Sequence, residues 1–404
     1  MYDTVLLVLD GKLSTEQASD KLGVSVRTIQ RKIQIYLDEG EAGFSHKLKG
    51  RSPVNITDVK TCSEIIALYR EKYADYNWSH FLEKLAEVEG IDVSYATIYT
   101  ILSEAGFISP RAHKPKRKRA IHPLRARRKA FGELVQMDAS KHIWFGDTYS
   151  HLHLAIDDAT SKILGAYFVR EETLRGYFEV FRQILTCYGV PKEFYTDRRR
   201  IFEYKRLGSG KLEKDHQTQF QLACAQFGVV RINTTSVPQA KGRVERAFGT
   251  LQDRLISEMR TADIATIEEA NEFLPNFIAD HNMRFALNSD HCANAFGLKP
   301  SGEELNLGLA VVSTRKVLSG NVVRFEGKDL QPWCKTGQVY LPKGFEVVVV
   351  KAYDSSLFIS VGDKVWPLYD VYTKPKEVAH SEIEGRLYEQ RRYEYLIKKY
   401  RQAA

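Results

Sequence analysis

The feature that most constrains the fold is an alternation of strand-like and helix-like runs between residues 133 and 259. Three apolar runs come first, and helices then alternate with further strands. The expected strands are 133–145, 152–160, 163–169, 193–197 and 229–233, and the expected helices are 174–189, 217–228 and 239–259. This order predicts a mixed α/β domain. We expect that domain to extend over residues 133–300.

Three acidic residues occupy positions in this pattern where a site could form. Asp138 lies in the first strand, Asp197 ends the fourth, and Glu245 lies near the start of the last helix. A sheet that pairs the first and fourth strands brings the two aspartates together, and the helix can lay Glu245 over the strand ends. Three converging carboxylates repel one another and favour bound Mg²⁺, with Mn²⁺ as a substitute. Two such ions stabilise the attacking and leaving oxygens of phosphoryl transfer.

These acidic residues also have a simpler interpretation. An aspartate at a strand end is usually a turn former or a helix cap, and spacing alone does not establish convergence. Asp157 and Asp158 end the second strand. One of them could be a further acidic group near the metals, but we favour turn and capping roles for both. Lys241 and Arg243 flank Glu245, and we expect them either to grip a DNA phosphate or simply to be exposed.

Residues 14–40 predict two helices joined by a tight turn. Ser14 and Gln17 have the spacing of a capping box, and Gly23 is expected to end the first helix. The second helix carries an apolar stripe formed by Ile29, Ile33 and Leu37. Together they predict a helix-turn-helix in an all-α domain of residues 1–50.

The opposite face of that second helix is polar, as a helix that reads the major groove of DNA requires. The expected DNA contacts on this face are Arg27, Thr28, Gln30 and Arg31. An ordinary helical hairpin is the alternative.

A second helical unit with a weaker helix-turn-helix pattern is expected over residues 51–108. Apolar residues from Trp78 to Leu85 have helical spacing, and a turn and a helix capped by Ser94 follow. The expected DNA contacts are Tyr95 and Thr97. The alternative is a helical scaffold that supports the first unit.

Residues 109–132 form a strongly basic segment. They include ten Lys or Arg, no Asp or Glu, and three prolines that exclude one continuous helix. A solvated linker is the simpler interpretation, but uncompensated charge next to DNA-binding helices favours an extended linker that follows phosphates. Its expected DNA contacts are Lys114, Lys116, Arg117, Lys118 and Arg119. The net charge of +8 agrees with a polyanionic partner.

The C-terminal part predicts a small β-barrel over residues 301–375, followed by a charged, solvated helix over 376–404. The expected strands are 322–327, 338–342, 345–353, 357–362 and 364–372, with glycine or Asp-Ser turns between them.

Several protein classes are disfavoured by the sequence. Five scattered cysteines argue for a reducing compartment and against a disulfide framework, and the eleven histidines form no zinc-ligand set. The N-terminal run MYDTVLLVLDGK is not expected to be a signal peptide, because it has no basic region and no cleavage site. The sequence contains no apolar run of the ~20 residues that span a bilayer and no nucleotide-binding P-loop. We therefore expect a cytoplasmic protein without a membrane partner.

The three acids, in their sequence contexts, resemble the DDE signature of the retroviral-integrase superfamily, and most closely that of bacterial insertion-sequence transposases. The matching segments are Q-M-D at Asp138, I-D-D-A-T-S, Y-T-D at Asp197, and P-Q-A-K-G-R-V-E-R at Glu245. The resemblance implies an RNase H-like catalytic core and Mg²⁺-dependent cleavage that exposes 3′-OH groups at the element ends. It also implies transfer of those ends into target DNA and helix-turn-helix units that bind the terminal inverted repeats. At least a dimer would hold two ends, and the location would be bacterial and nucleoid-associated.

The sequence departs from that family at the second motif. Asp197 is followed by Arg198 and Arg199 rather than by the common Asp-Asn or Asp-Arg-Gly. The 47 residues between Asp197 and Glu245 exceed the common spacing, and the polar segment 203–216 accounts for this as an inserted loop. A DNA-binding regulator or architectural protein with an inactive core is the alternative, although all three acidic positions are filled. A serine recombinase would need a catalytic domain where this chain has its first helix-turn-helix.

Overall fold

The computed structural model describes residues 1–44, 57–111, 125–202, 217–234, 241–288, 292–334, 336–362 and 364–372. They divide into two compact units. One comprises Met1–Glu71 and Asp92–Phe107, and the other comprises Lys72–Ile91 and the described residues from Ile108 onward. Outside the described residues lie the inserted loop, the C-terminal helix, and the predicted contacts Lys114, Lys116, Arg117, Lys118 and Arg119.

The first unit begins with α1 (Tyr2–Leu9), α2 (Thr15–Leu22), α3 (Val26–Glu39) and the 3-10 helix η1 (Gly40–Phe44). The predicted caps are confirmed: Ser14 and Gln17 form a capping box, and Gly23 ends α2 with a φ of 64°. The predicted apolar stripe is only partly buried, because Leu37 is 63% exposed. At this end of α3, Tyr2 of α1 packs against Tyr36 and Phe44 instead.

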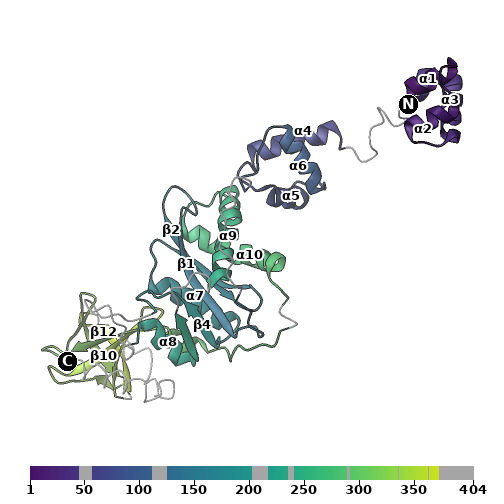
Figure 1. The fold of residues 1–404 in the computed structure, drawn as a ribbon. Coiled ribbons are helices and arrows are strands. Elements are labelled where there is room, and N and C mark those ends of the chain that lie inside the picture. The colour runs from purple at the N-terminus through teal and green to yellow at the C-terminus, as the bar shows by residue number, and fades with distance from the viewer. Residues whose placement is uncertain are drawn as a thin grey trace, which may run out of the picture. The chain divides into compact units, whose positions relative to one another are not determined.

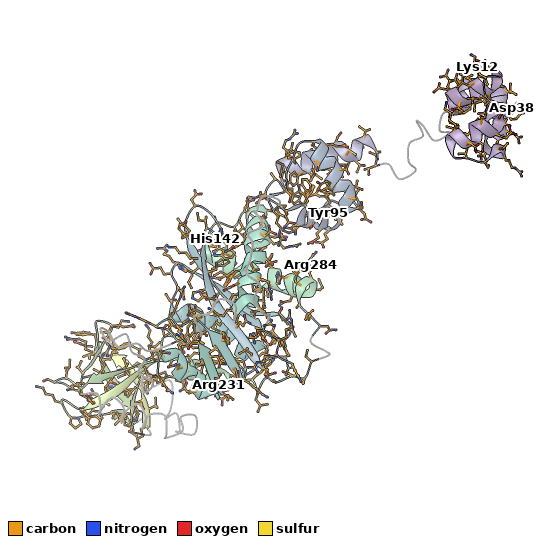
Figure 2. The ribbon with its side chains drawn as sticks, viewed as in Figure 1. Lys12, Asp38, Tyr95, His142, Arg231 and Arg284 are labelled. Atoms are coloured by element: carbon orange, nitrogen blue, oxygen red, sulfur yellow. The ribbon has the colours of Figure 1, made fainter. Side chains whose placement is uncertain are left out.

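The first unit also contains α4 (Val59–Glu71) and α6 (Tyr95–Glu104). The start of α6 repeats that of α3: Ser94 accepts a hydrogen bond from the backbone N–H of Thr97, as Ser25 does from that of Thr28. Tyr95 is exposed at this start (Figure 2). The sequence pattern predicts α6 but neither α1 nor α4.

The second unit contains a five-stranded sheet with the order β3-β2-β1-β4-β5. Its strands are β1 (Leu134–His142), β2 (Ser150–Asp157), β3 (Ile163–Val169), β4 (Glu193–Thr196) and β5 (Arg231–Thr234). β1, β2 and β3 pair antiparallel with one another, whereas β4 is parallel to both β1 and β5. The predicted mixed α/β core is therefore confirmed.

Helices cover both faces of this sheet (Figure 1). On one face, α7 (Leu174–Cys187) and α8 (Gln219–Phe227) share a core with Val135 and Met137 of β1. On the other, α9 (Gly242–Thr261) and α10 (Ile267–Phe285) pack against Leu152 and Leu154 of β2. Side chains alternate between the faces of a strand, so the apolar pattern of each strand feeds both cores.

A further helix, α5 (Trp78–Glu87), lies in the second unit and is joined to the C-terminal half of α9 by polar side chains. The pairs are Asn77–Asp253, His80–Glu258, Lys84–Glu258 and Glu83–Arg254. Glu83 accepts two hydrogen bonds from Arg254, at 2.7 and 2.8 Å, and one from Arg284 of α10 at 3.2 Å. The sequence predicts this helix but gives no sign of its partner.

Replacing Glu83 with glutamine is expected to lower the free energy of unfolding by about 1–3 kcal/mol, because a buried arginine loses its charged partner. Burial by itself raises the pKa of Glu83, but the hydrogen bonds and charge of Arg254 outweigh burial and hold the pKa below its ordinary value. A carboxylate of this kind stabilises the fold above its unfolded pKa, and that contribution is lost as the pH falls through its folded pKa. Urea denaturation at neutral and acidic pH should therefore show a difference between wild type and variant that shrinks in acid.

The matched control for this variant is Glu272→Gln, at an exposed position of α10. It should change the free energy of unfolding by no more than about 0.5 kcal/mol. Equal losses in both variants would contradict the role given to the Glu83–Arg254 pair.

The C-terminal part of the second unit is a nearly closed, barrel-like sheet preceded by α11 (Gly302–Gly308). Its strands are β6 (Val311–Lys316), β7 (Val323–Phe325), β8 (Lys328–Cys334), β9 (Gly337–Gln338), β10 (Glu346–Lys351), β11 (Leu357–Val361) and β12 (Lys364–Asp370). The order is β6-β10-β11-β12-β8-β7, with β9 paired to β8. The sequence pattern missed β6 and β8, whose polar residues hide the alternation, and the strand predicted at 338–342 is reduced to β9.

Within the part of the chain that the structure describes, no helix is long and apolar enough to cross a membrane.

Candidate active site

Asp138 and Asp197 belong to neighbouring strands. β1 and β4 are parallel, with Gln136 opposite Tyr195. If this register is continued for two residues, Asp138 of β1 lies opposite Asp197, which follows directly after the end of β4. Burial raises the pKa of the Tyr177 hydroxyl on α7 well above its ordinary value, and the charges of both aspartates add to the shift. The two carboxylates therefore lie near one buried group.

Glu245 lies in the first turn of α9, close to Asp138. The Glu245 side chain is exposed overall, yet desolvation of its carboxyl group raises its pKa, the charge of Asp138 raises it further, and the charge of Lys241 lowers it. Glu245 is thus coupled electrostatically to Asp138. Asp138 therefore lies near Glu245, and it shares the neighbourhood of Tyr177 with Asp197.

Each aspartate has a basic partner. Lys241 Nζ lies 3.0 Å from Asp138 Oδ2, and Arg199 Nε lies 2.7 Å from Asp197 Oδ2. The backbone N–H of Arg199 also donates to Asp197 Oδ1 at 3.1 Å. Arg199 forms a second ion pair with Glu172, so its guanidinium bridges two carboxylates.

Asp158 is fully buried beside this site and joins three parts of the chain. Gln136 Nε2 of β1 and Arg243 Nη1 of α9 both donate to its Oδ1 at 2.7 Å. From the end of the basic segment, Arg125 pairs with the same oxygen, and the backbone N–H of Arg128 donates to Oδ2 at 2.9 Å. These bonds fix the start of α9 on the sheet.

The neighbouring Asp157 has the turn chemistry expected of it. Its carboxylate accepts hydrogen bonds from the N–H and hydroxyl of Thr160, at 2.7 and 2.8 Å, and from the N–H of Gly132 at 2.9 Å. Sequence reasoning treated Asp157 and Asp158 alike, and nothing in I-D-D-A-T identifies which of them receives the arginines.

The predicted DNA contacts that the structure describes differ in their exposure. Arg27, Gln30, Arg31 and Tyr95 are exposed, whereas the hydroxyls of Thr28 and Thr97 lie 2.9 Å from the capping serine hydroxyls. Lys241 and Arg243 are buried, at 7% and 9% exposure, on Asp138 and Asp158. The sequence left open that both residues are simply exposed, and the structure shows that neither is. Arg243 contacts the carboxylate of Asp158.

The donor set fits a hard divalent cation, since carboxylate oxygens are the ligands that Mg²⁺ and Mn²⁺ prefer. Among the described residues, no group of three or more His, Cys, Asp or Glu side chains is gathered closely enough to hold a metal ion as it stands. Lys241 and Arg199 instead supply the positive charge next to the aspartates.

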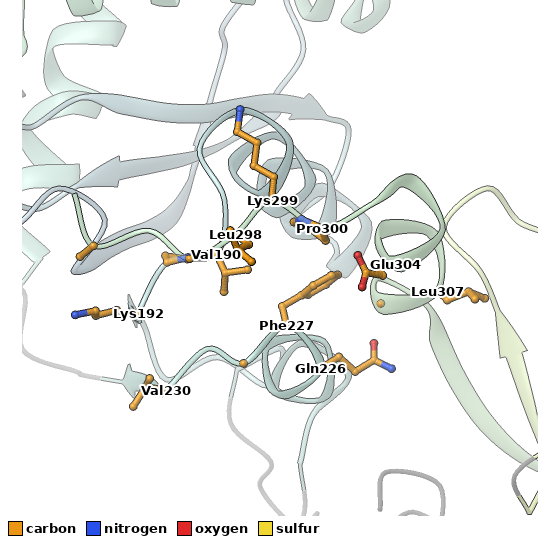
Figure 3. Close-up of a pocket in the computed structure, with 15 residues that line it drawn as sticks. Val190, Lys192, Gln226, Phe227, Val230, Leu298, Lys299, Pro300, Glu304 and Leu307 are labelled. Carbon is orange, nitrogen blue, oxygen red and sulfur yellow. The ribbon is translucent and has the colours of Figure 1, made fainter. Parts of the chain in front are cut away.

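The acids do not belong to the cavity of about 610 Å³ shown in Figure 3. That cavity is lined by residues of the loop before β4, the end of α8, the segment 295–300 and α11, among them Phe227, Leu298 and Lys299. Asp138, Asp197 and Glu245 are absent from its lining.

Comparison with known proteins gives the class of this chain. No family model matches it. The transposase for insertion sequence IS1202 of Streptococcus pneumoniae is 36% identical over 420 residues, which cover 96% of this chain and 88% of that protein. A protein of Sinorhizobium fredii, y4bF, is also named as a transposase and is 38% identical over 285 residues, 69% of this chain and 60% of that protein. These relatives make the chain a transposase.

More particularly, the chain belongs to the family of insertion-sequence transposases. Among solved structures, a simian T-cell lymphotropic virus intasome in complex with PP2A regulatory subunit B56 gamma matches with a TM-score of 0.32 and 15% identity, covering 78% of this chain and 99% of that chain. A similarity at this level carries no structural argument.

Proposed function

We propose that this transposase cleaves DNA at the ends of its insertion sequence to expose 3′-OH groups and joins these ends to target DNA. Asp138, Asp197 and Glu245 would hold divalent metal ions, Mg²⁺ or Mn²⁺ in its place. The observation that carries the proposal is the parallel pairing of β1 with β4, which sets Gln136 opposite Tyr195, two residues before Asp138 and Asp197 respectively. The electrostatic coupling of Glu245 to Asp138 supports the third ligand.

The core would be of the RNase H-like type, since its sheet has three antiparallel strands followed by two parallel ones. Bound metal ions would activate the attacking hydroxyl and stabilise charge on the phosphate oxygens. The chain's own contribution would be to orient that chemistry, with Asp138 within β1, Asp197 directly after β4, and Glu245 on the first turn of a helix anchored through Arg243. Water would attack the phosphodiester at the element end and break its P–O3′ bond, which leaves a 3′-OH and a 5′-phosphate. That 3′-OH would then attack a target phosphodiester and displace the 3′-oxygen of the target strand as a new 3′-OH.

The remaining parts would bind DNA and a second protomer. The helix-turn-helix of residues 1–50 and the unit of residues 51–108 would bind the terminal inverted repeats. The basic segment 109–132 and the barrel 301–375 would hold DNA, and at least a dimer would bring two ends together.

The test is a cleavage and joining assay with purified protein and labelled DNA that carries the element's own ends, in Mg²⁺ or in EDTA. Nicking and joining at the ends in Mg²⁺, absent in EDTA, is the expected result. Tight end binding without cleavage in Mg²⁺ or Mn²⁺ would favour a DNA-binding regulator with an inactive core.

Replacing both Arg27 and Arg31 with alanine is expected to weaken binding to the element ends by about tenfold or more, because exposed arginines on a recognition helix contact bases and phosphates. Gel shifts with end and random DNA, at several salt concentrations, measure affinity and sequence preference. Lys21→Ala, on the exposed surface of α2, is the matched control. Unchanged affinity and preference in the double variant would mean that α3 is not the reader.

A further inference from the structure

We propose that Lys241 and Arg199 are built-in counter-ions that occupy the carboxylates of Asp138 and Asp197 in the metal-free protein and leave them when a divalent cation binds. The inference rests on the proposed function, since it takes these acids as metal ligands. It assigns the two basic residues a role in metal binding that is opposite in sign to that of the acids.

Lys241 carries the first part of the argument. It stands at the start of α9 with 8% of its side chain exposed, and its ammonium lies 3.0 Å from Asp138 Oδ2. A buried ammonium without a carboxylate partner is strongly unfavourable. The same charge lowers the pKa of Glu245, against burial and Asp138, which raise it. One ammonium therefore relieves the repulsion between two of the three acids.

Arg199 compensates the negative charge of Asp197. Its Nε lies 2.7 Å from Asp197 Oδ2, and its guanidinium also pairs with Glu172. Glu172 in turn accepts a hydrogen bond from the Tyr177 hydroxyl at 2.8 Å. Arg199 therefore keeps a second anchor when it leaves Asp197, so its displacement does not require the surrounding segment to unfold.

A cation bound by Asp138 and Glu245 would take over the charge compensation that Lys241 provides. Two positive charges within a few ångströms in a partly buried site repel each other, so the metal-bound and Lys241-bound states of Asp138 exclude one another. By linkage, a bound metal ion weakens the contact between Lys241 and Asp138. That contact lowers the affinity for the metal ion by the same factor. The displaced ammonium and guanidinium then lie beside the site with charge available to a DNA phosphate.

The experiment is a Mn²⁺ titration of the full-length protein without DNA, by calorimetry or by the spin-resonance signal of free Mn²⁺. Lys241→Met, a neutral replacement of similar shape, should bind Mn²⁺ about tenfold more tightly than wild type, a difference of about 1.4 kcal/mol. Lys141→Met is the charge-matched control on β1, because Lys141 lies over the Tyr149 ring rather than on a carboxylate. Its affinity should stay within about twofold of wild type, since exposed charges are screened by salt.

A gain in metal affinity separates this inference from a structural role, because a damaged site would bind less. Affinity in Lys241→Met that is equal to or below wild type overturns the inference, as does an equal gain in Lys141→Met. Arg199→Gln, at a side chain that is 51% exposed, repeats the test at Asp197 should Lys241→Met not fold. Asp138→Asn tests the proposed function separately: if it binds Mn²⁺ as well as wild type does, the metal site itself is wrongly assigned.

Discussion

Asparagine in place of Asp138 or Asp197, or glutamine in place of Glu245, should lower the rate of strand transfer at least about a thousandfold, on the order of 4 kcal/mol of transition-state stabilisation. Each substitution keeps the shape of the side chain but removes the negative charge that a metal ion needs. Binding to the element ends should persist, because α3 and α6, which carry the proposed end contacts, lie in the first unit. Joining of labelled ends measures the rate, and gel shifts measure the binding.

Asp147→Asn is the matched control for these variants, since Asp147 is exposed between β1 and β2. It should leave strand transfer unchanged. Loss of end binding in Asp197→Asn would show that Asp197 has a structural role, and unimpaired transfer in Glu245→Gln would mean that another residue completes the site. Glu203 and Glu213 would then be the next candidates, because both fall between Asp197 and Glu245 in the chain.

The central sheet could be predicted because its signals are local. Apolar runs bounded by turn residues identify the strands, and the pairing of β1 with β4 follows the expectation that led to Asp138 and Asp197. The capping box at Ser14 is equally local, because both of its hydrogen bonds lie within four residues.

Contacts between distant segments left no such signal. The pairs Glu83–Arg254 and Arg243–Asp158 join residues 171 and 85 positions apart, and an arginine in sequence looks the same whether it faces DNA or a buried carboxylate. Lys241 and Arg243 were for this reason expected at a phosphate or at the surface, whereas both are buried against aspartates.

The second large effect concerns stability. Replacing Asp158 with alanine should lower the free energy of unfolding by about 3–5 kcal/mol, because it leaves one buried and one partly buried guanidinium group without their counter-charge. Arg243 is 9% exposed and would lose its carboxylate partner, and Arg125 would lose the same oxygen. Urea denaturation measures the loss, provided that the slope with denaturant is unchanged. Asp147→Ala is the control and should fall within about 0.5 kcal/mol of wild type.

Adding Arg125→Met to Asp158→Ala distinguishes two causes of the lost stability, namely the unpaired positive charge and the loss of packing. If the unpaired charge is the cause, the double variant should recover part of the stability, since one of the two stranded guanidinium groups is gone. Additive losses would mean that Asp158 and Arg125 act independently. Recovery would also explain why Asp158 stands next to an acidic site without serving it as a ligand. Arg125 and Arg243 neutralise the charge of Asp158. Through Arg243, Asp158 fixes the turn of α9 that carries Glu245.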